Sequence, residues 1–304
     1  VNWYVRNPKS VNYILEEKHN PGYLSSVELD TSKLNLNTDI SFIAEESDVL
    51  IFAIPSAFIN SQLSKLSVDI SAKIIVSAVK GIIPESGLLL GEYFHQKKSV
   101  PFDKIAIIGG PCHAEEVALE RLSYLTIASK NPIIANEIAS TFSCEYIKTK
   151  THDDVVGTEY AAMLKNIYAI AAGIFHGLGY GDNLQSVLMS NSIREMKRFI
   201  KKVYKMKRKI NETVYLGDLL VTGYSTFSRN RMFGNMIGKG YTVKSAQMEM
   251  NMIAEGYYAS KSAFKINEGN LFSAKTPIID AVYKVLHKEK DPKEVFKKLA
   301  NILD

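Results

Sequence analysis

Cysteine is scarce in this sequence: its 304 residues include only two, Cys112 and Cys144. Two cysteines cannot supply the several cross-links on which small secreted domains depend. A fold built on a disulfide framework is therefore excluded, and a reducing cytoplasm is the expected location of the protein.

Long apolar runs and a strong excess of one charge are also lacking. The longest apolar stretch, residues 167–180, is interrupted by His176 and several glycines, so we expect no membrane span. The 37 basic and 32 acidic residues give a net charge of +5, which favours small anionic ligands without requiring nucleic acid. The six histidines show no paired spacing of metal ligands, so we expect no metal site.

The densest basic segment is KRFIKKVYKMKRK, residues 197–209. Its apolar residues, at positions 199, 200, 203, 204 and 206, predict an amphipathic helix whose basic face is solvated. A nucleic-acid-binding patch is the alternative interpretation. Because no RNA-binding motif or zinc-finger spacing accompanies the segment, we favour the helix.

The first half of the chain alternates between apolar strands and helices. Strands are predicted at residues 1–6, 48–55, 73–81, 104–111, 123–129 and 144–150. A helix should follow the first strand, because Asn7 can cap it and Pro8 suits its first turn. Continuous apolar strands separated by helices predict a parallel sheet covered on both faces.

From about residue 155 the pattern changes to long helices with few candidate strands. The sequence therefore predicts an α/β fold of two domains. Residues 1–154 would form a Rossmann-like, doubly wound sheet, and residues 155–304 would form an all-α domain.

Three of the predicted strands end in unusual residues. These are Pro55 with Ser56, Lys80 with Gly81, and the turn of Gly109, Gly110 and Pro111. Ligands of doubly wound sheets bind outside the carboxyl ends of the strands. The free amides of a glycine turn that leads into a helix can hold an anion or a carboxamide. We therefore expect a binding edge here, although Lys80 alone could equally be a solvated loop lysine.

One lysine lies in the segment EYAAMLKNIYAIAAG, residues 159–173, which is otherwise suited to burial. At about 100° per residue, the helical face that carries Lys165 also carries Thr158, Ala161, Ala169 and Ala172. Lys165 could extend past these alanines to water. Alternatively, it could be desolvated, with a pKa lowered into the range that is useful for proton transfer. The helix alone does not decide between the two.

A second polar cluster lies in residues 217–240. Asp218 and Thr222 share a face if Asp218 begins a helix. The sequence SRNR at 228–231 then offers a hydroxyl, an amide and guanidinium groups, a set that suits a phosphate dianion. A polar turn with solvated arginines is the alternative.

Six motifs follow one another along the chain. They are SAVKG at 77–81, GGPCHAEEVA at 109–118, LKNIYAIAAG at 164–173, GDLLVT at 217–222, SRNRMFG at 228–234 and AEGY at 254–257. In their order and spacing they resemble the NAD(P)-dependent glycerol-3-phosphate dehydrogenases of the bacterial type. Each motif is unspecific alone, whereas all six in the family's order are specific, and the resemblance spans almost the whole chain.

The resemblance implies that residues 1–154 bind the dinucleotide and that residues 155–304 bind the substrate and carry the catalytic groups. It also implies a role for each of several residues. Lys165 would be the general acid and base at the substrate oxygen, and Lys80 would touch both substrate and cofactor. Asp218 would complete the catalytic set, and together with Thr222 it would hold the charge network around the lysines. Further substrate contacts would come from Gly110, Cys112, Asn166, Thr222, Ser228, Arg229 and Asn230. Further cofactor contacts would come from Arg6, Pro55, Ala114, Arg229, Ile253 and Glu255.

Two features depart from the family pattern. The turn that usually reads Gly-Pro-Thr-Phe is here Gly110, Pro111, Cys112 and His113, so the contacts of its last two side chains should differ while the backbone role is kept. The glycine-rich first strand and turn that cradle the pyrophosphate have no counterpart, because residues 1–8 match the family's second strand. The sequence thus starts about 25 residues, one βα unit, later than the family pattern; either the natural chain extends upstream or this is a fragment.

The expected reaction is the reversible reduction of dihydroxyacetone phosphate to sn-glycerol 3-phosphate with NAD(P)H, which supplies glycerol 3-phosphate for phospholipid synthesis. One alternative is a related hydroxy-acid dehydrogenase of the same two-domain build, which would not need the donors of residues 228–231. The other alternative is a non-catalytic binding protein. The sequence disfavours it because the lysines and the aspartate expected of the catalytic site, Lys80, Lys165 and Asp218, are retained. A homodimer is a possible assembly of the protein.

The first predicted strand ends in YVRNP, without the carboxylate that would repel a 2′-phosphate. Arg6 can pair with such a phosphate, so NADPH should be accepted at least as well as NADH. The alternative is that Arg6 stacks on the adenine and is indifferent to the phosphate.

Overall fold

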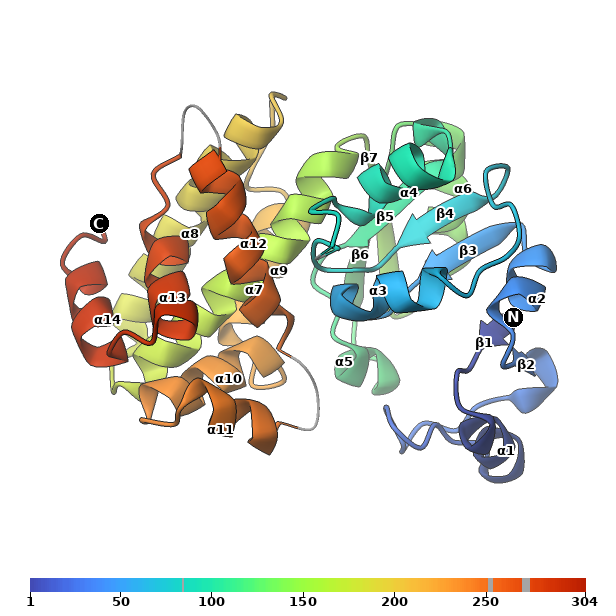
Figure 1. The fold of residues 1–304 in the computed structure, drawn as a ribbon, viewed down its shortest axis with the longest axis horizontal. Helices are drawn as coiled ribbons and strands as arrows, with labels where there is room; N and C mark the ends of the chain where they lie inside the picture. Colours follow the sequence, from blue (N-terminus) through green and yellow to red (C-terminus); the bar gives the residue numbers. More distant parts are fainter. Residues whose placement is uncertain (84, 251–253, 270–273) are drawn as a thin grey trace.

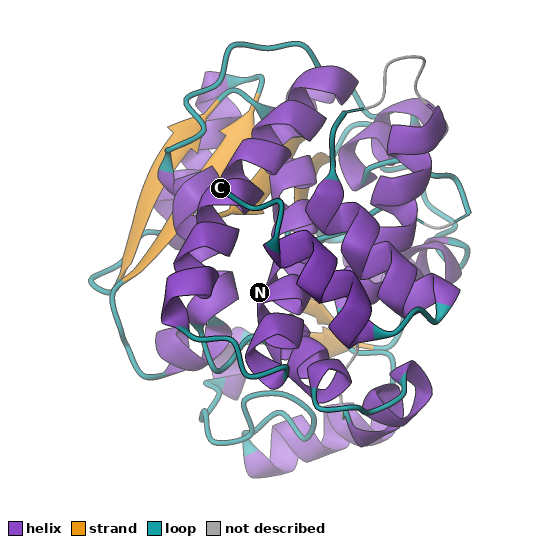
Figure 2. Ribbon diagram, turned by 90° about the vertical axis from the view of Figure 1, so that its left-hand side faces the viewer, coloured by secondary structure: helices purple, strands orange, loops and turns teal. Residues whose placement is uncertain are grey.

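The computed structural model describes residues 1–83, 85–250, 254–269 and 274–304. The described chain has a strand-containing N-terminal part and a helical C-terminal part, which are joined through the long helix α7 (Figure 1). Within the described residues no strand follows His152, so every strand found there lies in the first half of the chain. Figure 2 shows these strands in orange and the helices in purple. The predicted change of pattern near residue 155 is therefore present in the structure.

The strands form two sheets. β1 (Asn2–Tyr4) pairs in parallel with β2 (Asn35–Asn37), a strand that the sequence did not indicate. The larger sheet has the order β3-β4-β5-β6-β7, with bounds Val49–Phe52, Ile74–Ser77, Ile105–Gly109, Ser123–Ser129 and Ile147–His152. One prediction is wrong: the sheet is not wholly parallel, because β6 runs antiparallel to β5.

Antiparallel pairing of β5 and β6 follows from the short connection between them. Residues 110–122 connect the two strands, and the one helix among them is the five-residue α5 (Ala114–Ala118). A parallel neighbour needs a crossover that runs back along the whole sheet, usually as a helix. A helix of five residues is only about 7.5 Å long, too short for that return. The chain therefore returns beside β5 in the opposite direction, and the turn after β5 lies next to β6.

Helices cover both faces of the larger sheet with apolar side chains. On one face, α3 (Ser56–Leu63) and α4 (Leu90–Lys98) bury Ile59 and Phe94 against β4 and β5. On the other face, α6 (Pro132–Phe142) buries Ile134 and Ile138. The expected layers are confirmed, and they leave the carboxyl ends of β4 and β5 facing the C-terminal helices.

The first two helices begin at side chains that cap them, and for the first one this is the cap that the sequence predicts. α1 (Pro8–Glu17) begins after Asn7, whose side chain accepts the N–H of Lys9 at 3.0 Å. α2 (Ile40–Glu45) is capped in the same way by Asp39. Both helices start at side chains that accept otherwise unpaired amides, as helix N-termini require.

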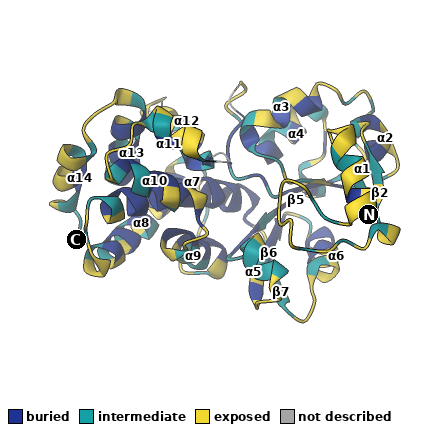
Figure 3. Ribbon diagram, turned by 90° about the horizontal axis from the view of Figure 1, so that it is seen from below, coloured by how far each residue is buried: buried dark blue, intermediate teal, exposed yellow. Residues whose placement is uncertain are grey.

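The C-terminal part is organised around α7 (Val155–Gly177), which is dark blue along its length in Figure 3 because nearly every residue in it is buried. The surrounding helices are α8 (Asp182–Val203), α9 (Asp218–Tyr224), α10 (Arg229–Gly238), α11 (Val243–Glu249), α12 (Glu255–Gly269), α13 (Pro277–Lys288) and α14 (Pro292–Ala300). A helix that is apolar on all sides must be covered on all sides, and these helices provide the cover.

Glycines let α10 and α12 lie unusually close to α7. A Cβ atom on Gly234 would lie 2.1 Å from the carbonyl oxygen of Ile170, and one on Gly173 would lie 2.0 Å from that of Arg231. A Cβ on Gly256 would lie 2.6 Å from the carbonyl oxygen of Asn166. These backbone contacts fix the first residues of α10 and α12 beside the Lys165 region of α7.

The prediction for the basic segment 197–209 is only partly right. α8 ends at Val203, and residues 204–209 have no helical structure. Arg208 is not solvated either: its side chain is 4% exposed and pairs with the buried Asp154. None of the described helices is both long and apolar enough to span a bilayer.

Candidate active site

Lys165 is buried at the middle of α7, with 4% of its surface exposed. Its ammonium group donates to Oδ1 of Asp218, the first residue of α9. Asp218 is itself 3% exposed, so the ion pair lies inside the protein. A lysine that extends past its alanine neighbours to water is therefore excluded, and the desolvated interpretation is confirmed.

Burial lowers the pKa of Lys165 to about 8. The nearby Asp218 carboxylate opposes this shift, and the charge of Lys80 adds to it. Glu255, at the start of α12, also favours the protonated form. A lysine with a pKa near neutral pH can both give and accept a proton during turnover.

Asp218 is held from two sides. Its Oδ2 accepts the N–H of Gly110 at 3.4 Å, which ties α9 to the turn after β5. One helical turn further on, the Thr222 hydroxyl donates to the backbone carbonyl of Asp218 at 2.7 Å. Asp218 does begin a helix that Thr222 shares, as predicted, but the Thr222 hydroxyl bonds to the backbone rather than to the charged groups.

The turn after β5 requires glycine at position 110. Gly110 has φ +114°, and a Cβ there would lie 2.6 Å from the carbonyl oxygen of Tyr124. Cys112 follows half-buried, and burial raises the pKa of its thiol. The next residue, His113, has its pKa lowered by burial and by the charges of Lys165 and Lys80. The turn therefore carries these two side chains to the edge of the Lys165 site.

Lys80 and Glu255 complete the charged group. Lys80 lies shortly after β4, which ends at Ser77, and it is close enough for its charge to lower the pKa of Lys165. Burial raises the pKa of Glu255, while Lys80, Lys165 and Arg229 act in the opposite direction. The end of β4, the middle of α7 and the start of α10 thus place three cations around the carboxylate at the start of α12.

The segment Ser228, Arg229 and Asn230 forms the start of α10. Ser228 is its N-cap and accepts the N–H of Arg231 at 3.3 Å. Asn230 is buried, and its Oδ1 accepts the N–H of Gly256 at 2.9 Å, so this oxygen serves to hold α12. The Arg229 guanidinium is 43% exposed and lies 3.9 Å from Glu115 of α5. At this exposure the pair contributes little to stability, which leaves Arg229 free to bind an anion.

Two buried nitrogen atoms in this region lack hydrogen-bond partners: Nδ2 of Asn166, beside Lys165, and Nε2 of His113. Buried polar atoms are normally satisfied, and each exception calls for an explanation. A bound ligand that supplies acceptors would account for both. The residues around Lys165 therefore fit a site that a substrate and a dinucleotide complete.

The other predicted cofactor residues are more dispersed. Pro55 precedes α3, and the next residue, Ser56, hydrogen-bonds Glu255 through its backbone. Ala114 is exposed at the start of α5. Arg6 is exposed at the end of β1, which Figure 1 shows well away from α7. Ile253 lies outside the described residues.

Some of the structurally important residues were missed by the sequence interpretation. Glu115, the neighbour of Arg229, was within a quoted motif but had no role assigned. Arg208 was hidden among solvated lysines, and nothing local distinguished it. Tyr215, whose hydroxyl donates to the Asp154 carboxylate, belongs to none of the six motifs. The one usable signal was Asp154, whose place just before the Lys165 helix is that of a capping residue.

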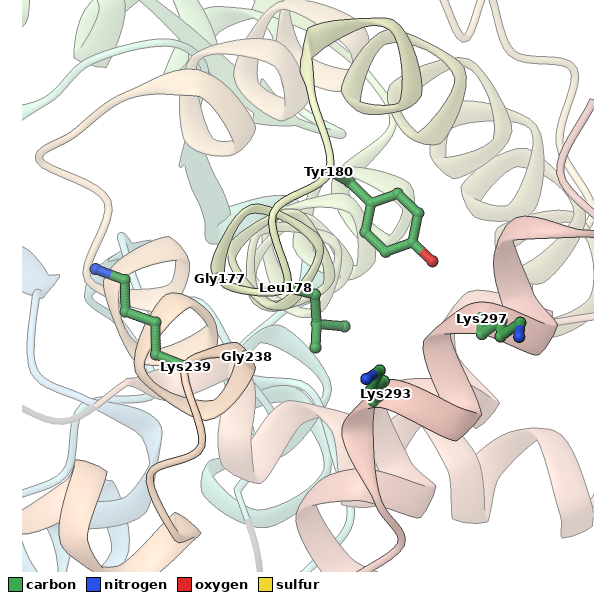
Figure 4. A pocket seen from close by; sticks show the side chains of 7 residues that line it. All are labelled: Gly177, Leu178, Tyr180, Gly238, Lys239, Lys293 and Lys297. Atoms are coloured by element: carbon green, nitrogen blue, oxygen red, sulfur yellow. The ribbon is translucent and has the colours of Figure 1, made fainter.

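A separate cavity of about 520 Å³ lies at the opposite end of α7 from Asp154. Figure 4 shows that Lys293 and Lys297 reach it from α14 and that the Tyr180 ring turns toward the same space, while Lys239 points away. None of the predicted site residues lines it. The chemistry implied by the Lys165–Asp218 pair therefore belongs elsewhere.

Comparison with known families agrees with this geometry. Residues 1–147 match the family model described as the NAD-dependent glycerol-3-phosphate dehydrogenase N-terminus, and residues 154–297 match the corresponding C-terminus. This chain belongs to the NAD-dependent glycerol-3-phosphate dehydrogenase family. The chain-wide resemblance that the six motifs indicated is confirmed.

Individual relatives and solved structures agree. The chain is 34% identical to a glycerol-3-phosphate dehydrogenase [NAD(P)+] of Clostridium botulinum, with 96% of this chain and 87% of the relative covered. It is 34% identical to that of Bacillus subtilis, with 91% and 80% covered. The crystal structure of the Coxiella burnetii enzyme superposes with a TM-score of 0.89 at 26% identity, covering 98% of this chain and 90% of that one.

Proposed function

We propose that this protein interconverts dihydroxyacetone phosphate and sn-glycerol 3-phosphate with NAD(P)H. The observation that carries the proposal is the buried Lys165–Asp218 pair, with Lys80 and Arg229 on the adjoining elements. A carbonyl reduction needs a proton donor at the oxygen and positive charge to stabilise the developing alkoxide. Family membership and the names of the relatives support the same reaction.

The residues divide the chemistry as follows. Bound NAD(P)H supplies the hydride that reduces the carbonyl carbon. Lys165 gives its proton to the carbonyl oxygen, and Asp218 holds the ammonium group in place for that transfer. Lys80 adds positive charge beside the same oxygen. The unpartnered Nδ2 of Asn166 donates to the substrate.

The phosphate would be bound at the start of α10. Arg229 offers a planar fork of donors that matches phosphate oxygens. Ser228 and the amino group of Asn230 add donors, and the Gly110 turn with Cys112 closes the pocket. Toward the cofactor, the contacts would come from Arg6, Pro55, Lys80, Ala114, Arg229 and Glu255.

We further propose a division of labour between residues 1–154, which would hold the dinucleotide, and residues 155–304, which would bind the substrate. The product would supply phospholipid synthesis. A cytoplasmic location rests on the two unpaired cysteines, and a homodimer stays a prediction.

The direct test is to follow NADPH and NADH oxidation by the purified protein with dihydroxyacetone phosphate. The two alternatives make different predictions. A hydroxy-acid dehydrogenase would reduce a 2-keto acid and ignore the phosphorylated ketone, and a binding protein would oxidise neither cofactor. Activity confined to dihydroxyacetone phosphate supports the proposal, and activity confined to the keto acid contradicts it.

Replacing Arg229 with alanine should mainly impair use of the phosphorylated substrate, because the phosphate loses its fork donor. We expect kcat/KM for dihydroxyacetone phosphate to fall by about tenfold to a hundredfold, as for a lost charge-assisted hydrogen bond of about 1.5–3 kcal/mol. Unphosphorylated dihydroxyacetone should be far less affected. Lys239→Ala, at the opposite end of α10 and distant from the site, is the control. An equal loss for both substrates would show that Arg229 does not bind the phosphate.

The kinetics should depend on pH in opposite senses in the two directions. Ketone reduction needs protonated Lys165, so kcat/KM should fall as the pH rises through about 8. Alcohol oxidation needs the neutral amine, so its kcat/KM should rise through the same pH. Initial rates in both directions between pH 6 and pH 10 check this. The same trend in both directions would exclude Lys165 as the titrating group.

Replacing Arg6 with alanine tests the choice of cofactor. If Arg6 pairs with a 2′-phosphate, the variant should lose kcat/KM for NADPH while keeping it for NADH. The wild type should use NADPH at least as well as NADH. A wild-type preference for NADH above about tenfold, or the same ratio in Arg6→Ala, would show that Arg6 does not select the cofactor.

A further inference from the structure

A second buried charged cluster lies where α7 begins. Asp154 is fully buried, and its Oδ1 caps α7 by accepting the N–H of Gly157 at 3.0 Å. The Arg208 guanidinium also binds this carboxylate, through Nε to Oδ2 and through Nη2 to Oδ1 at 3.1 Å. The Tyr215 hydroxyl donates to Oδ2 at 2.6 Å. One carboxylate therefore joins the start of α7 to two residues more than fifty positions away in the sequence.

Tyr215 belongs to the π-helical turn Thr213–Gly217, which leads directly into α9. Asp218, the partner of Lys165, is the first residue after this turn. His152 links Asp154 to the same turn by a second route. The Asp154 N–H donates to Nδ1 of His152 at 2.8 Å. On the other side of the ring, Nε2 of His152 lies 3.0 Å from the carboxylate of Glu212, the residue just before the turn. π-helical turns are rare and are often found at functional sites.

We propose that Asp154 is a positioning residue for the proton-transfer pair, because through Tyr215 and Arg208 it fixes the turn that carries Asp218 against the helix that carries Lys165. The proposal rests on the proposed function. It concerns how the two catalytic groups are held and adds no group that touches the substrate.

The chemistry of the cluster suits this role better than it suits stability alone. A buried ion pair often contributes little net stability compared with apolar residues, because both charges lose their hydration. It does specify one arrangement, since the Asp154 carboxylate can satisfy Tyr215, Arg208 and Gly157 only when all three are in place. Burial acts to raise the pKa of Asp154, but the bonds from Arg208 and Tyr215 outweigh it and lower the pKa. The carboxylate therefore stays ionised and the contacts persist.

The consequence concerns the protonation of Lys165. Its charged surroundings are Asp218 on α9, Lys80 after β4 and Glu255 on α12, with His113 and Cys112 on the turn after β5. Of these, Asp218 most strongly favours the ammonium form. If the π-helical turn shifts and Asp218 moves away, Lys165 loses its proton at a lower pH. Loss of the Tyr215 hydroxyl, which does not contact Lys165, should then change both the rate of ketone reduction and its dependence on pH.

Tyr215→Phe is the test, because it removes one hydroxyl and leaves the ring in place. Tyr168→Phe is the matched control: Tyr168 is equally buried, lies on α7 and has a hydroxyl without a hydrogen-bond partner. A misplacement of catalytic groups of about 1 Å can cost on the order of 100-fold in rate. We expect Tyr215→Phe to lower kcat by about tenfold, with KM for dihydroxyacetone phosphate little changed, and to move the alkaline limb of the reduction profile to lower pH. Arg208→Lys, which keeps the charge but loses the fork, should act in the same direction.

A measurement without turnover separates this inference from the proposed function. The ¹³Cε shift of Lys165, followed by NMR, should titrate at lower pH in Tyr215→Phe than in wild type and Tyr168→Phe. A purely structural role would lower the melting temperature of Tyr215→Phe while leaving the Lys165 titration and kcat at the values of the Tyr168→Phe control, and that result would overturn the proposal. If wild type does not reduce dihydroxyacetone phosphate, the proposed function fails, yet the NMR titration still tests the positioning.

Discussion

Replacing Lys165 with alanine should lower kcat for dihydroxyacetone phosphate reduction by at least a hundredfold, because general acid–base groups typically contribute 10²–10⁴-fold. Lys165 is buried against Asp218, so no solvent lysine can take its place. The change removes the proton donor without altering Lys80 or Arg229. KM and the binding of NADPH, measured by fluorescence titration, should therefore change much less than kcat.

Two further variants sharpen this result. Lys165→Met keeps most of the side-chain volume and should be as inactive as the alanine variant, which separates the loss of the amine from the loss of packing. Lys261→Ala, an exposed lysine on α12, should keep wild-type kcat. If Lys165→Ala retained more than about a tenth of wild-type kcat, the assignment of the proton donor would be wrong.

The sequence predicts the order of elements well because its signals are local. Asn7 and Pro8 mark the start of α1, and continuous apolar runs mark β3, β4 and β5, whereas β7 (IKTKTH) has no such run. The direction of β6 is not a local property, since the residues of a buried strand look alike whichever way it runs. It depends on how short a connection the turn after Gly109 allows. The pairing of β2 with β1 was missed because β2 is only three residues long and has a single apolar residue, Leu36, between two asparagines. So short a segment shows no strand pattern.

The sequence predicts a site residue's surroundings only where they are set by its neighbours along the chain. The alanines around Lys165 indicate a closely packed face, and this packing leads to the observed burial. The Lys165–Asp218 contact joins residues 53 positions apart, and only the family resemblance suggested it. Arg208 shows the opposite case: its lysine neighbours indicate a solvated face, but its side chain is buried where it binds Asp154, 54 positions away.

The close approach of the helices explains how distant residues form one site. Gly173 and Gly234 let the backbones of α7 and α10 touch, and Gly256 does the same for α12. Helices that approach so closely cannot slide without steric clashes, because protein interiors are packed at crystal-like density. The first residues of α10 and α12, including Arg229 and Glu255, are thereby fixed relative to Lys165. The small residues on the facing sides of α7, α10 and α12 therefore determine where the charged groups of the site lie.

Replacing Asp218 with asparagine should lower kcat by about a hundredfold and also destabilise the protein in a pH-dependent way. The substitution leaves the shape of the side chain but removes the charge that favours protonated Lys165. The pKa of Lys165 should then fall below 8, so that little of the ammonium donor remains at neutral pH. Leaving one partner of a buried ion pair uncompensated costs about 3–5 kcal/mol.

The sign of the pH dependence follows from the protons bound in each state. In the unfolded chain a lysine keeps its proton up to about pH 10.4. Between the lowered pKa of the variant and about pH 8, folded Asp218→Asn has lost the Lys165 proton whereas the folded wild type retains it. The unfolded variant binds one more proton than the folded variant in that window, so its stability rises with pH there. The deficit in melting temperature relative to wild type should therefore be larger at pH 6 than at pH 9.

Adding Lys165→Met to Asp218→Asn decides whether the deficit comes from the unpaired charge. With both charged groups removed, the pocket has no ammonium to bury, and most of the melting temperature lost at pH 6 should return while kcat stays low. Asp182→Asn, at an exposed position on α8, controls for the loss of one negative charge and should behave like wild type. The interpretation of the ion pair would be contradicted by an Asp218→Asn deficit of the same size at pH 6 and pH 9, because a shape or packing defect does not depend on the protonation of Lys165.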